Sequence, residues 1–285
     1  MSQKVVQPSR DGAAAQGTPE HTMVQRRRRR DNATRGRKLG VIVVLMLVWQ
    51  LGPGLIGRED QIIPFAETVL ALWESVLDGS ILSAVAHTVG VLTLSLAIGV
   101  VIALILTALS TATLLGRDML EVLTAMLNPL PAVALVPVAI FLFGFGLPGI
   151  LFILVNATLW PMAVAWSSGF RGIGRTNVLA VGQNLGLKGL GLFTKIYLPA
   201  GVPSLLAGLR QAWAFGWRTI IAVELVFGSQ GGGGLGFFIG NARYLNQRAE
   251  VYAGLLMIII IGLTIERLVL EPIEARTVRR WGMSL

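Results

Sequence analysis

The chain has 285 residues, of which 54% are hydrophobic and only 14% charged, and its mean hydropathy is +0.69. A water-soluble domain of this length rarely carries such a composition, so the sequence indicates a protein that crosses a membrane several times. The formal net charge is +9, but much of the basic excess lies in one N-terminal segment with five consecutive arginines, Arg26 to Arg30. An apolar run follows closely, which favours a membrane anchor over a nucleic-acid-binding arm. Because the chain has no cysteine, disulfides and thiolate metal sites are excluded.

The N-terminal segment 1–36 is polar, basic and without apolar periodicity, which predicts a disordered cytoplasmic tail. The apolar run behind it, from Leu39 to Ile56, is not followed by a small-residue cleavage site. We therefore expect an uncleaved first membrane span rather than a signal peptide.

Six apolar stretches approach or exceed the roughly 20 residues that a helix needs to cross a bilayer. In chain order they are 39–56, 81–109, 120–143, 148–166, 200–227 and 251–270. Between the first two, the amphipathic segment from Pro64 to Leu77 carries acids and no base, which predicts a helix on the outer membrane surface. The expected architecture is an all-α membrane protein with a six-helix domain over 37–275 and a short cytoplasmic tail over 276–285.

The distribution of Lys and Arg predicts the orientation of these spans, because positive residues accumulate in cytoplasmic loops. Ten of them lie in the N-terminal tail, and others lie near Arg117, in the stretch 171–195 and near the C-terminus. The opposite loops hold only Arg58, Arg243 and Arg248. We expect a multi-pass protein of a bacterial inner membrane, with both termini and the loop before the fifth span in the cytoplasm.

That cytoplasmic loop is polar but compatible with helices. Polar and apolar residues are mixed between Gly174 and Gly191, which predicts short helices along the membrane surface, and several glycines lower their intrinsic stability. The loop closes with Gly186, a nine-residue spacer and Ile196-Tyr197-Leu198-Pro199. Two interpretations remain: a docking element for another protein, and an ordinary interfacial loop.

The spacing resembles the second half of the "EAA" loop of ABC-importer permeases, which reads Glu-Ala-Ala, three residues, Gly, nine residues, Ile, one residue, Leu-Pro. The resemblance extends to Pro129-Leu130-Pro131, Gly208-Leu209-Arg210, Ala222-Val223-Glu224 and Gly234-Leu235-Gly236. This set is similar to the sulfonate, taurine and nitrate branch of the family. One difference is that Ala180-Val181-Gly182 stands where the family usually has Glu-Ala-Ala.

The resemblance implies the type I ABC-importer fold, with six transmembrane helices and a cytoplasmic coupling helix between the fourth and fifth. It implies a translocation subunit that is not itself an enzyme and that moves small anions such as sulfonates, taurine or nitrate by alternating access. The implied partners are a second permease copy, a cytoplasmic ATPase dimer that binds ATP and Mg²⁺, an extracytoplasmic solute-binding protein and membrane lipid, and no cofactor or metal is expected in this chain. The residues expected to couple the ATPase to the spans are Leu185, Gly186, Leu187, Lys188, Ile196, Leu198 and Pro199.

The sequence agrees that ATP is bound elsewhere. It contains no G-x-x-x-x-G-K-[ST] phosphate-binding loop, and the glycines at 231–234 are followed by Leu235 rather than Lys. We interpret this glycine run as a flexible outer turn before a short surface or re-entrant piece.

The fifth span carries a stripe of small side chains and several ionisable groups. The stripe repeats every fourth residue and consists of Ser204, Gly208, Ala212 and Gly216. Such a pattern lets another helix approach closely, either within this chain or from a second copy. In the same span, Arg218 is a candidate anion ligand because its guanidinium offers a bidentate fork, and the alternative is an internal contact with Glu224 or with a carbonyl.

The third and fourth spans contain polar residues and prolines that bend helices and free backbone carbonyls. We expect them to line the solute pathway. Together with the two ionisable residues of the fifth span, the pathway candidates are Asn128, Pro131, Asn156, Thr158, Arg218 and Glu224. His87 and Asp118 have no metal-ligand or acid-base partner at useful spacing, and we interpret both as structural.

A self-sufficient secondary transporter or channel is the competing functional class. Such carriers usually show repeated halves with interrupted helices at matching positions. The prolines at 129–137 and the polar loop at 171–195 have no counterpart in the other half of the chain, which favours the importer subunit.

Overall fold

The computed structural model describes residues 19–58, 61–174 and 177–279, and within these ranges it contains helices and no strand. The chain divides into two compact units, residues 1–65 and 66–285. The prediction of an all-α membrane protein is confirmed.

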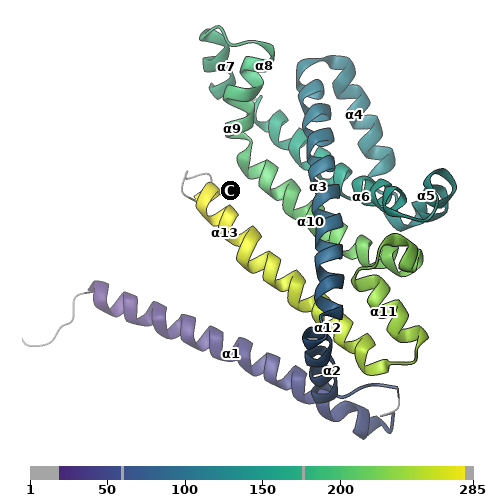
Figure 1. Cartoon of the computed structure of the whole chain (residues 1–285). Coiled ribbons are helices and arrows are strands. Elements are labelled where there is room, and N and C mark those ends of the chain that lie inside the picture. Colours follow the sequence, from purple (N-terminus) through teal and green to yellow (C-terminus); the bar gives the residue numbers. More distant parts are fainter. Residues whose placement is uncertain (1–18, 59–60, 175–176, 280–285) are drawn as a thin grey trace, which may run out of the picture. The chain divides into compact units, whose positions relative to one another are not determined.

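The first unit is built on one long helix, α1 (Pro19–Ile56) (Figure 1). The helix begins at Pro19, so helical structure extends into the segment 1–36 that was predicted to be a disordered tail; residues 1–18 lie outside the described range. Arg, Gln and Met have high helix propensity, which explains how a polar segment can continue the helix of the apolar run. Near the end of α1, the indole N–H of Trp49 donates to the Ile63 carbonyl over 3.0 Å.

The second unit begins with a surface helix and two long helices joined by a broken pair. The elements are α2 (Phe65–Leu77), α3 (Ser80–Ala112), α4 (Leu114–Leu127), η1 (Ala132–Leu135), α5 (Val136–Phe143) and α6 (Leu147–Ile173). The predicted amphipathic helix at 64–77 is confirmed by α2.

The remaining elements form the loop, the fifth span and the C-terminal helix. They are α7 (Asn177–Asn184), α8 (Gly189–Leu192), η2 (Phe193–Tyr197), α9 (Leu198–Ala200), α10 (Val202–Phe227), η3 (Gly228–Gly231), α11 (Leu235–Tyr244), α12 (Arg248–Ile265), η4 (Glu266–Leu270), α13 (Glu271–Glu274) and η5 (Ala275–Arg279). Helix therefore continues through Arg279 into the predicted C-terminal tail, whose residues 280–285 lie outside the described range.

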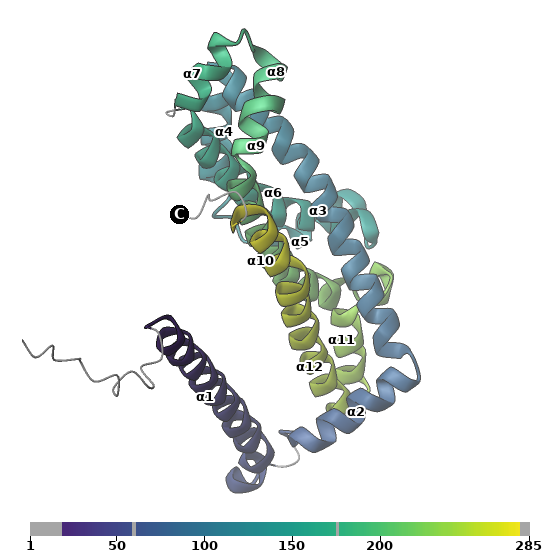
Figure 2. The ribbon, with the colours of Figure 1, turned by 90° about the vertical axis from the view of Figure 1, so that its left-hand side faces the viewer.

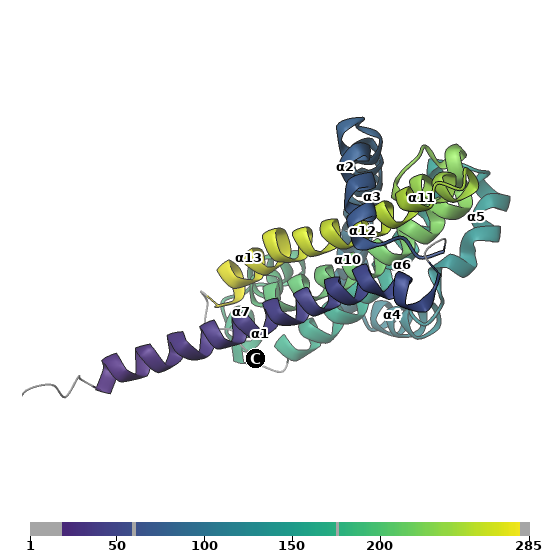
Figure 3. The same cartoon turned by 90° about the horizontal axis from the view of Figure 1, so that it is seen from below.

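Helix α6 is the centre of the second unit, because it packs against both α3 and α10 along its length (Figures 1 and 2). Helices α7 and α8 lie at one end of this unit, and α2, α11 and the start of α12 lie at the other, the end that Figure 3 views. We call these the α7–α8 end and the α11 end.

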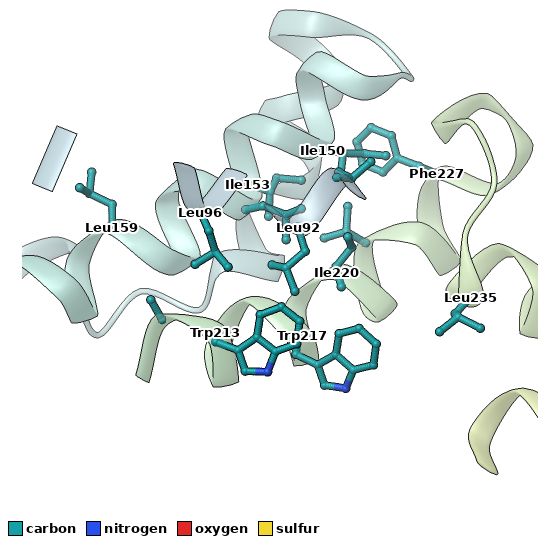
Figure 4. Packing of buried hydrophobic residues seen from close by; sticks show 14 of the residues in the cluster. Leu92, Leu96, Ile150, Ile153, Leu159, Trp213, Trp217, Ile220, Phe227 and Leu235 are labelled. Atoms are coloured by element: carbon teal, nitrogen blue, oxygen red, sulfur yellow. The ribbon is translucent and has the colours of Figure 1, made fainter. Parts of the chain in front are cut away.

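The core between α3, α6 and α10 is built from large apolar side chains (Figure 4). Leu92, Ile153 and Ile220 are fully buried within it. Trp213 and Trp217, one turn apart on α10, stack with ring centroids 5.6 Å apart. In a bilayer, van der Waals packing of such side chains, rather than their removal from water, holds these helices together.

Four helices in the described residues are long and apolar enough to cross a membrane, and up to six spans result if each of two bent pairs counts as one. The four are 36–56, 80–112, 147–173 and 248–277. The bent pairs are 114–127 with 132–143, at 89°, and 189–200 with 202–227, at 72°.

The third predicted span is therefore not one bent helix over 120–143 but two helices at nearly a right angle. Pro129 and Pro131 have no N–H to donate, and Pro131 adopts an extended backbone conformation that cannot continue α4. The chain then restarts as η1 and α5, with Pro137 in the first turn, where its missing N–H leaves no hydrogen bond unmade.

Candidate functional site

The loop between α7 and α8 turns sharply at Gly186. Helix α7 closes with two hydrogen bonds of a Schellman motif, from Gly186 N to Gln183 O (2.9 Å) and from Leu187 N to Gly182 O (3.1 Å). This motif needs a left-handed residue after the helix, and Gly186 has φ +77°. The glycine that the sequence analysis singled out thus sets the shape of the loop.

Three apolar side chains project from this loop into the surroundings. Leu185 is 74% exposed, Leu190 is 76% exposed and Val181 is 56% exposed. Lys188 lies between them and is also exposed. A surface with apolar anchors beside a cation is typical of a protein-docking element.

The loop returns toward the fifth span through η2 and α9, which carry Ile196, Leu198 and Pro199. Ile196 and Leu198 are half-buried, and Pro199 lies in the first turn of α9. Phe170, fully buried at the end of α6, contacts the ring of Tyr197 with centroids 5.8 Å apart and that of Phe193 at 5.6 Å. The loop is therefore fixed to α6 by an aromatic cluster that the sequence analysis did not identify.

The departure from Glu-Ala-Ala has a packing explanation at its last position. Gly182 is buried against η2, and a Cβ built there would lie 2.9 Å from Ile196 Cγ1 and 3.1 Å from Leu192 Cδ1. In this chain α7 therefore approaches η2 more closely than an alanine would allow without movement of these side chains.

The small-residue stripe of α10 faces α6 and α3 of the same chain. A Cβ on Gly208 would lie 2.5 Å from Trp166 Nε1, and a Cβ on Gly216 would lie 2.6 Å from Leu92 Cδ1. Ala212 between them is fully buried. Ser204, at the start of the stripe, lies against Gly169 of α6, so the stripe has its partner within the chain.

The pathway candidates do not come together in one place. Asn128 and Pro131 are exposed at the break between α4 and η1. Thr158 is fully buried beside Gly216, and its hydroxyl donates to the Leu154 carbonyl over 2.9 Å. Within the described residues, Asn156 Oδ1 is buried and has no hydrogen-bond partner, and the same holds for the indole nitrogen of Trp160 one turn later.

The predicted salt bridge between Arg218 and Glu224 is wrong. Arg218 is exposed and makes no ion pair with the described residues, because six helical positions place the two side chains on different faces of α10. Glu224 is 1% exposed, accepts a hydrogen bond from the Thr88 hydroxyl over 2.9 Å and another from Gly236 N over 2.9 Å.

The hydrogen bonds around Glu224, which we call the Glu224 network, explain the Gly234-Leu235-Gly236 sequence at the end of the glycine run. Leu235 N donates to the Thr88 hydroxyl oxygen over 2.8 Å, so one threonine connects α3, α10 and α11. A Cβ on Gly234, where φ is +100°, would lie 2.2 Å from a Glu224 carboxylate oxygen. Sequence reasoning found Glu224 but missed Thr88, because nothing in the sequence indicates that α3 crosses α10 there.

Arg210 ties the fifth span to the C-terminal helix. Its guanidinium donates to a carboxylate oxygen of Glu266 and, over 2.7 Å, to one of Glu274. In the sequence this arginine stood out only as part of the Gly208-Leu209-Arg210 motif. The signal in the sequence for its partners was the group of acidic residues after position 265, which includes Glu266 and Glu274.

A polar cavity of about 670 Å³ opens at the α11 end. Asp78, His87 and Glu250 contribute to its lining, and the Nε2 atom of His87 is buried with no hydrogen-bond partner among the described residues. Hydrogen bonds from the hydroxyl and the backbone N–H of Ser80 lower the pKa of the Asp78 carboxyl, so this residue stays ionised at neutral pH. The described residues contain no group of three or more His, Cys, Asp or Glu placed to hold a metal ion.

Long apolar helices around a common core, with an exposed loop at one end, define a helical membrane protein. The chain belongs to the family of binding-protein-dependent transport system inner membrane components, whose model matches residues 99–269. It is an ABC transporter permease with the type I importer membrane fold.

Curated relatives of the chain are named as permease proteins. The chain is 28% identical over 221 residues to a putative aliphatic sulfonates transport permease protein of Escherichia coli, a match that covers 77% of this chain and 82% of that protein. It is 31% identical over 151 residues to a putative ABC transporter permease protein of Methanocaldococcus jannaschii and 30% identical over 152 residues to a nitrate import permease protein of Leptolyngbya laminosa. The last two matches cover 53% of this chain and only 55% and 52% of those relatives.

Proposed function

We propose that this permease forms the pathway by which an ATP-driven importer moves a small organic or inorganic anion across a bacterial inner membrane. In this proposal two copies of the chain pair with a cytoplasmic ATPase dimer, which binds ATP and Mg²⁺, and with a solute-binding protein on the outer side. Both termini lie in the cytoplasm, as the distribution of Lys and Arg predicts.

The observation that carries the proposal is the α7–α8 end. A Schellman turn at Gly186 presents Leu185, Lys188 and Leu190 on a loop that is fixed to α6 through Phe170. A loop with exposed apolar anchors and a rigid base is suited to transmit movement of a bound ATPase to the helices.

The two ends of the second unit lie on opposite sides of its helices, which supports a different binding partner for each end. If α7 and α8 contact the ATPase, the acidic cavity with Asp78 and Glu250 faces the outside. That cavity is then available to the solute-binding protein. Because the α10 stripe is filled by α6 and α3, a second copy of the chain would have to contact another face.

Anion transport is supported by three relatives: the names of the two described above specify aliphatic sulfonates and nitrate, and that of an Escherichia coli permease, 28% identical over 150 residues, specifies taurine. In this chain Arg218 is an exposed guanidinium on α10 and therefore able to meet a solute between two copies. The test is Arg218→Gln: uptake should fall for anions, and unchanged uptake with an unchanged order of substrates would remove this residue from the pathway.

The coupling role is tested with the double substitution Leu185→Asp and Leu190→Asp in the permease reconstituted with its ATPase and binding protein. We expect ATP-driven uptake to be lost and the ATPase to bind more weakly. The matched control is Leu245→Asp, an exposed leucine at the α11 end, which should leave ATPase binding unchanged. Uptake that persists without ATP or without the ATPase would overturn the proposal in favour of a secondary transporter.

A further inference from the structure

A second polar cavity lies at the α7–α8 end, where the corner between α3 and α4 meets the end of α6. Its volume is about 380 Å³, and Arg117 and Arg171 contribute to its lining. The hydroxyl-bearing residues of the lining are Ser110, Thr111, Thr113, Ser167 and Tyr197. Two guanidiniums among five hydroxyls make this cavity chemically unlike the acidic cavity at the α11 end.

The two arginines are not neutralised within the described residues. Arg117 Nε lies 3.4 Å from Glu121 Oε1, and Arg171 Nη1 lies 3.7 Å from the same oxygen. One carboxylate therefore pairs with two guanidiniums, and the three side chains together carry one net positive charge. All three side chains are between two-fifths and about half exposed, so these ion pairs are weak and exchange readily for a stronger acceptor.

The start of α4 adds to the positive potential. Helix α4 is 14 residues long, and Thr113 and Leu114 at its start line the cavity. Thr113 Oγ1 accepts a hydrogen bond from Gly116 N over 3.0 Å, which covers only one of the free N–H groups of the first turn. The positive end of the helix dipole therefore lies beside the two guanidiniums.

An apolar cavity of about 330 Å³ adjoins the polar one. The two share Thr111, Ala112 and Tyr197 in their linings. The rest of the apolar cavity is formed mainly by hydrocarbon, including Leu109, Leu192 and Phe193. A charged head and an apolar chain of one molecule can therefore lie on either side of Tyr197.

We propose that this polar cavity binds an oxyanion of phosphate or sulfonate chemistry through Arg117 and Arg171. Guanidinium pairs recognise such groups by charge-assisted, geometrically matched hydrogen bonds. The oxyanion can come from an anionic phospholipid, whose acyl chain would occupy the apolar cavity, or from an anion free in solution. The apolar cavity favours the phospholipid. The assignment to the cytoplasmic leaflet rests on the proposed orientation, whereas binding itself does not.

Native mass spectrometry of the full-length permease in detergent tests the site, with phosphatidylglycerol and phosphatidylcholine added in equal amounts. The wild type should retain phosphatidylglycerol preferentially. The double substitution Arg117→Gln and Arg171→Gln should lower its retention about tenfold or more, because charge-assisted bonds are lost. Glu121→Gln removes the carboxylate that competes with the oxyanion, at a half-exposed position, and should raise retention. A gain in retention cannot result from misfolding, so this variant supports the site even if the double variant fails to fold.

The matched control is the double substitution Arg243→Gln and Arg248→Gln, two exposed arginines at the α11 end, which should not change retention. Calorimetric titration with inorganic phosphate distinguishes the sources: phosphate binding without a lipid preference assigns the site to a free anion, and lipid preference without phosphate binding assigns it to the headgroup. The proposal is overturned if neither probe binds, or if the arginine and Glu121 variants bind both probes as the wild type does. Leu190 also lines the apolar cavity, so ATP-driven uptake of the single variant Leu185→Asp is the test of coupling that does not depend on this outcome.

Discussion

The two ends of the second unit differ in whether the chain itself supplies partners for the side chains that lie there. At the α11 end, Glu224, Thr88 and the backbone of Gly236 complete one another's hydrogen bonds inside the chain. At the α7–α8 end, the backbone closes at Gly186, while Leu185 and Leu190 stay exposed. The difference teaches that Glu224 joins three helices within the chain at the first end, whereas the proposed ATPase contact at the second end would bury side chains that the chain itself leaves exposed.

This contrast fits a subunit that receives movement at one end. Buried polar groups in an apolar environment are costly to separate, so the Glu224 network should keep α3, α10 and α11 moving together. A loop that is fixed through side-chain contacts of Phe170 and that turns at two left-handed glycines, Gly186 and Gly189, has fewer such constraints. We therefore expect substitutions at the α11 end to act mainly on stability and those at the α7–α8 end to act mainly on coupling.

The largest effect should follow from Glu224→Ala. It leaves the Thr88 hydroxyl and the Gly236 N–H without their acceptor in a buried site, at about 1–3 kcal/mol for each group. Thermal unfolding in detergent, followed by tryptophan fluorescence, should show a marked fall in Tm. Glu224→Gln keeps an acceptor oxygen and should cost less, and Glu74→Ala, at an exposed position of α2, is the control. Equal losses for all three variants would mean that the network does not hold this end together.

The next largest effect concerns the α10 stripe that connects the two ends. Gly208→Ala places a Cβ 2.5 Å from Trp166 Nε1, whose hydrogen bond to the Leu205 carbonyl is 3.0 Å long. Overpacking of this kind costs about 1–3 kcal/mol. The control is Gly90→Ala on α3, where a Cβ would meet nothing within 4 Å and helix propensity should improve. Tm should fall for the first variant and not for the second, and the reverse order would refute the packing of α10 on α6.

Features that depend on residues close in the sequence were predicted, whereas contacts between residues far apart in the sequence were not. Hydropathy located the apolar segments, because it depends on neighbouring residues, and the spacing shared with the family singled out Gly186. The right-angle break after α4 was foreshadowed by Pro129 and Pro131, but the prediction of a single bent span underestimated two prolines separated by one residue.

Partners distant in the sequence were the part that could not be predicted. Thr88 and Glu224 are 136 positions apart, and nothing local marks a threonine in an apolar helix as the partner of a buried acid. The same holds for Arg210, whose partners Glu266 and Glu274 lie on the C-terminal helix. The Arg218–Glu224 pair was predicted from proximity along one helix, where helical geometry places the two side chains on different faces.

A smaller effect, confined to the α7–α8 end, is expected for Gly186→Ala. Alanine at φ +77° is strained by about 1 kcal/mol, so the last turn of α7 should fray. Hydrogen exchange should speed up at Leu187, whose N–H closes the Schellman motif, while Tm of the whole protein changes little. Gly191→Ala in α8, with only a distant contact to Leu187, is the control and should leave exchange unchanged. A large fall in Tm would show that this loop belongs to the core after all.

The smallest effect is expected for Gly182→Ala, which restores the family's alanine at this position. Alanine is favoured over glycine within a helix by about 1 kcal/mol, but its Cβ would lie 2.9 Å from Ile196 Cγ1, and the two effects should nearly cancel. A double-mutant cycle with Ile196→Ala separates them: once the isoleucine is shortened, Gly182→Ala should become stabilising. If Gly182→Ala has the same effect on Tm with and without Ile196, then close packing of α7 on η2 is not the reason why glycine stands at this position.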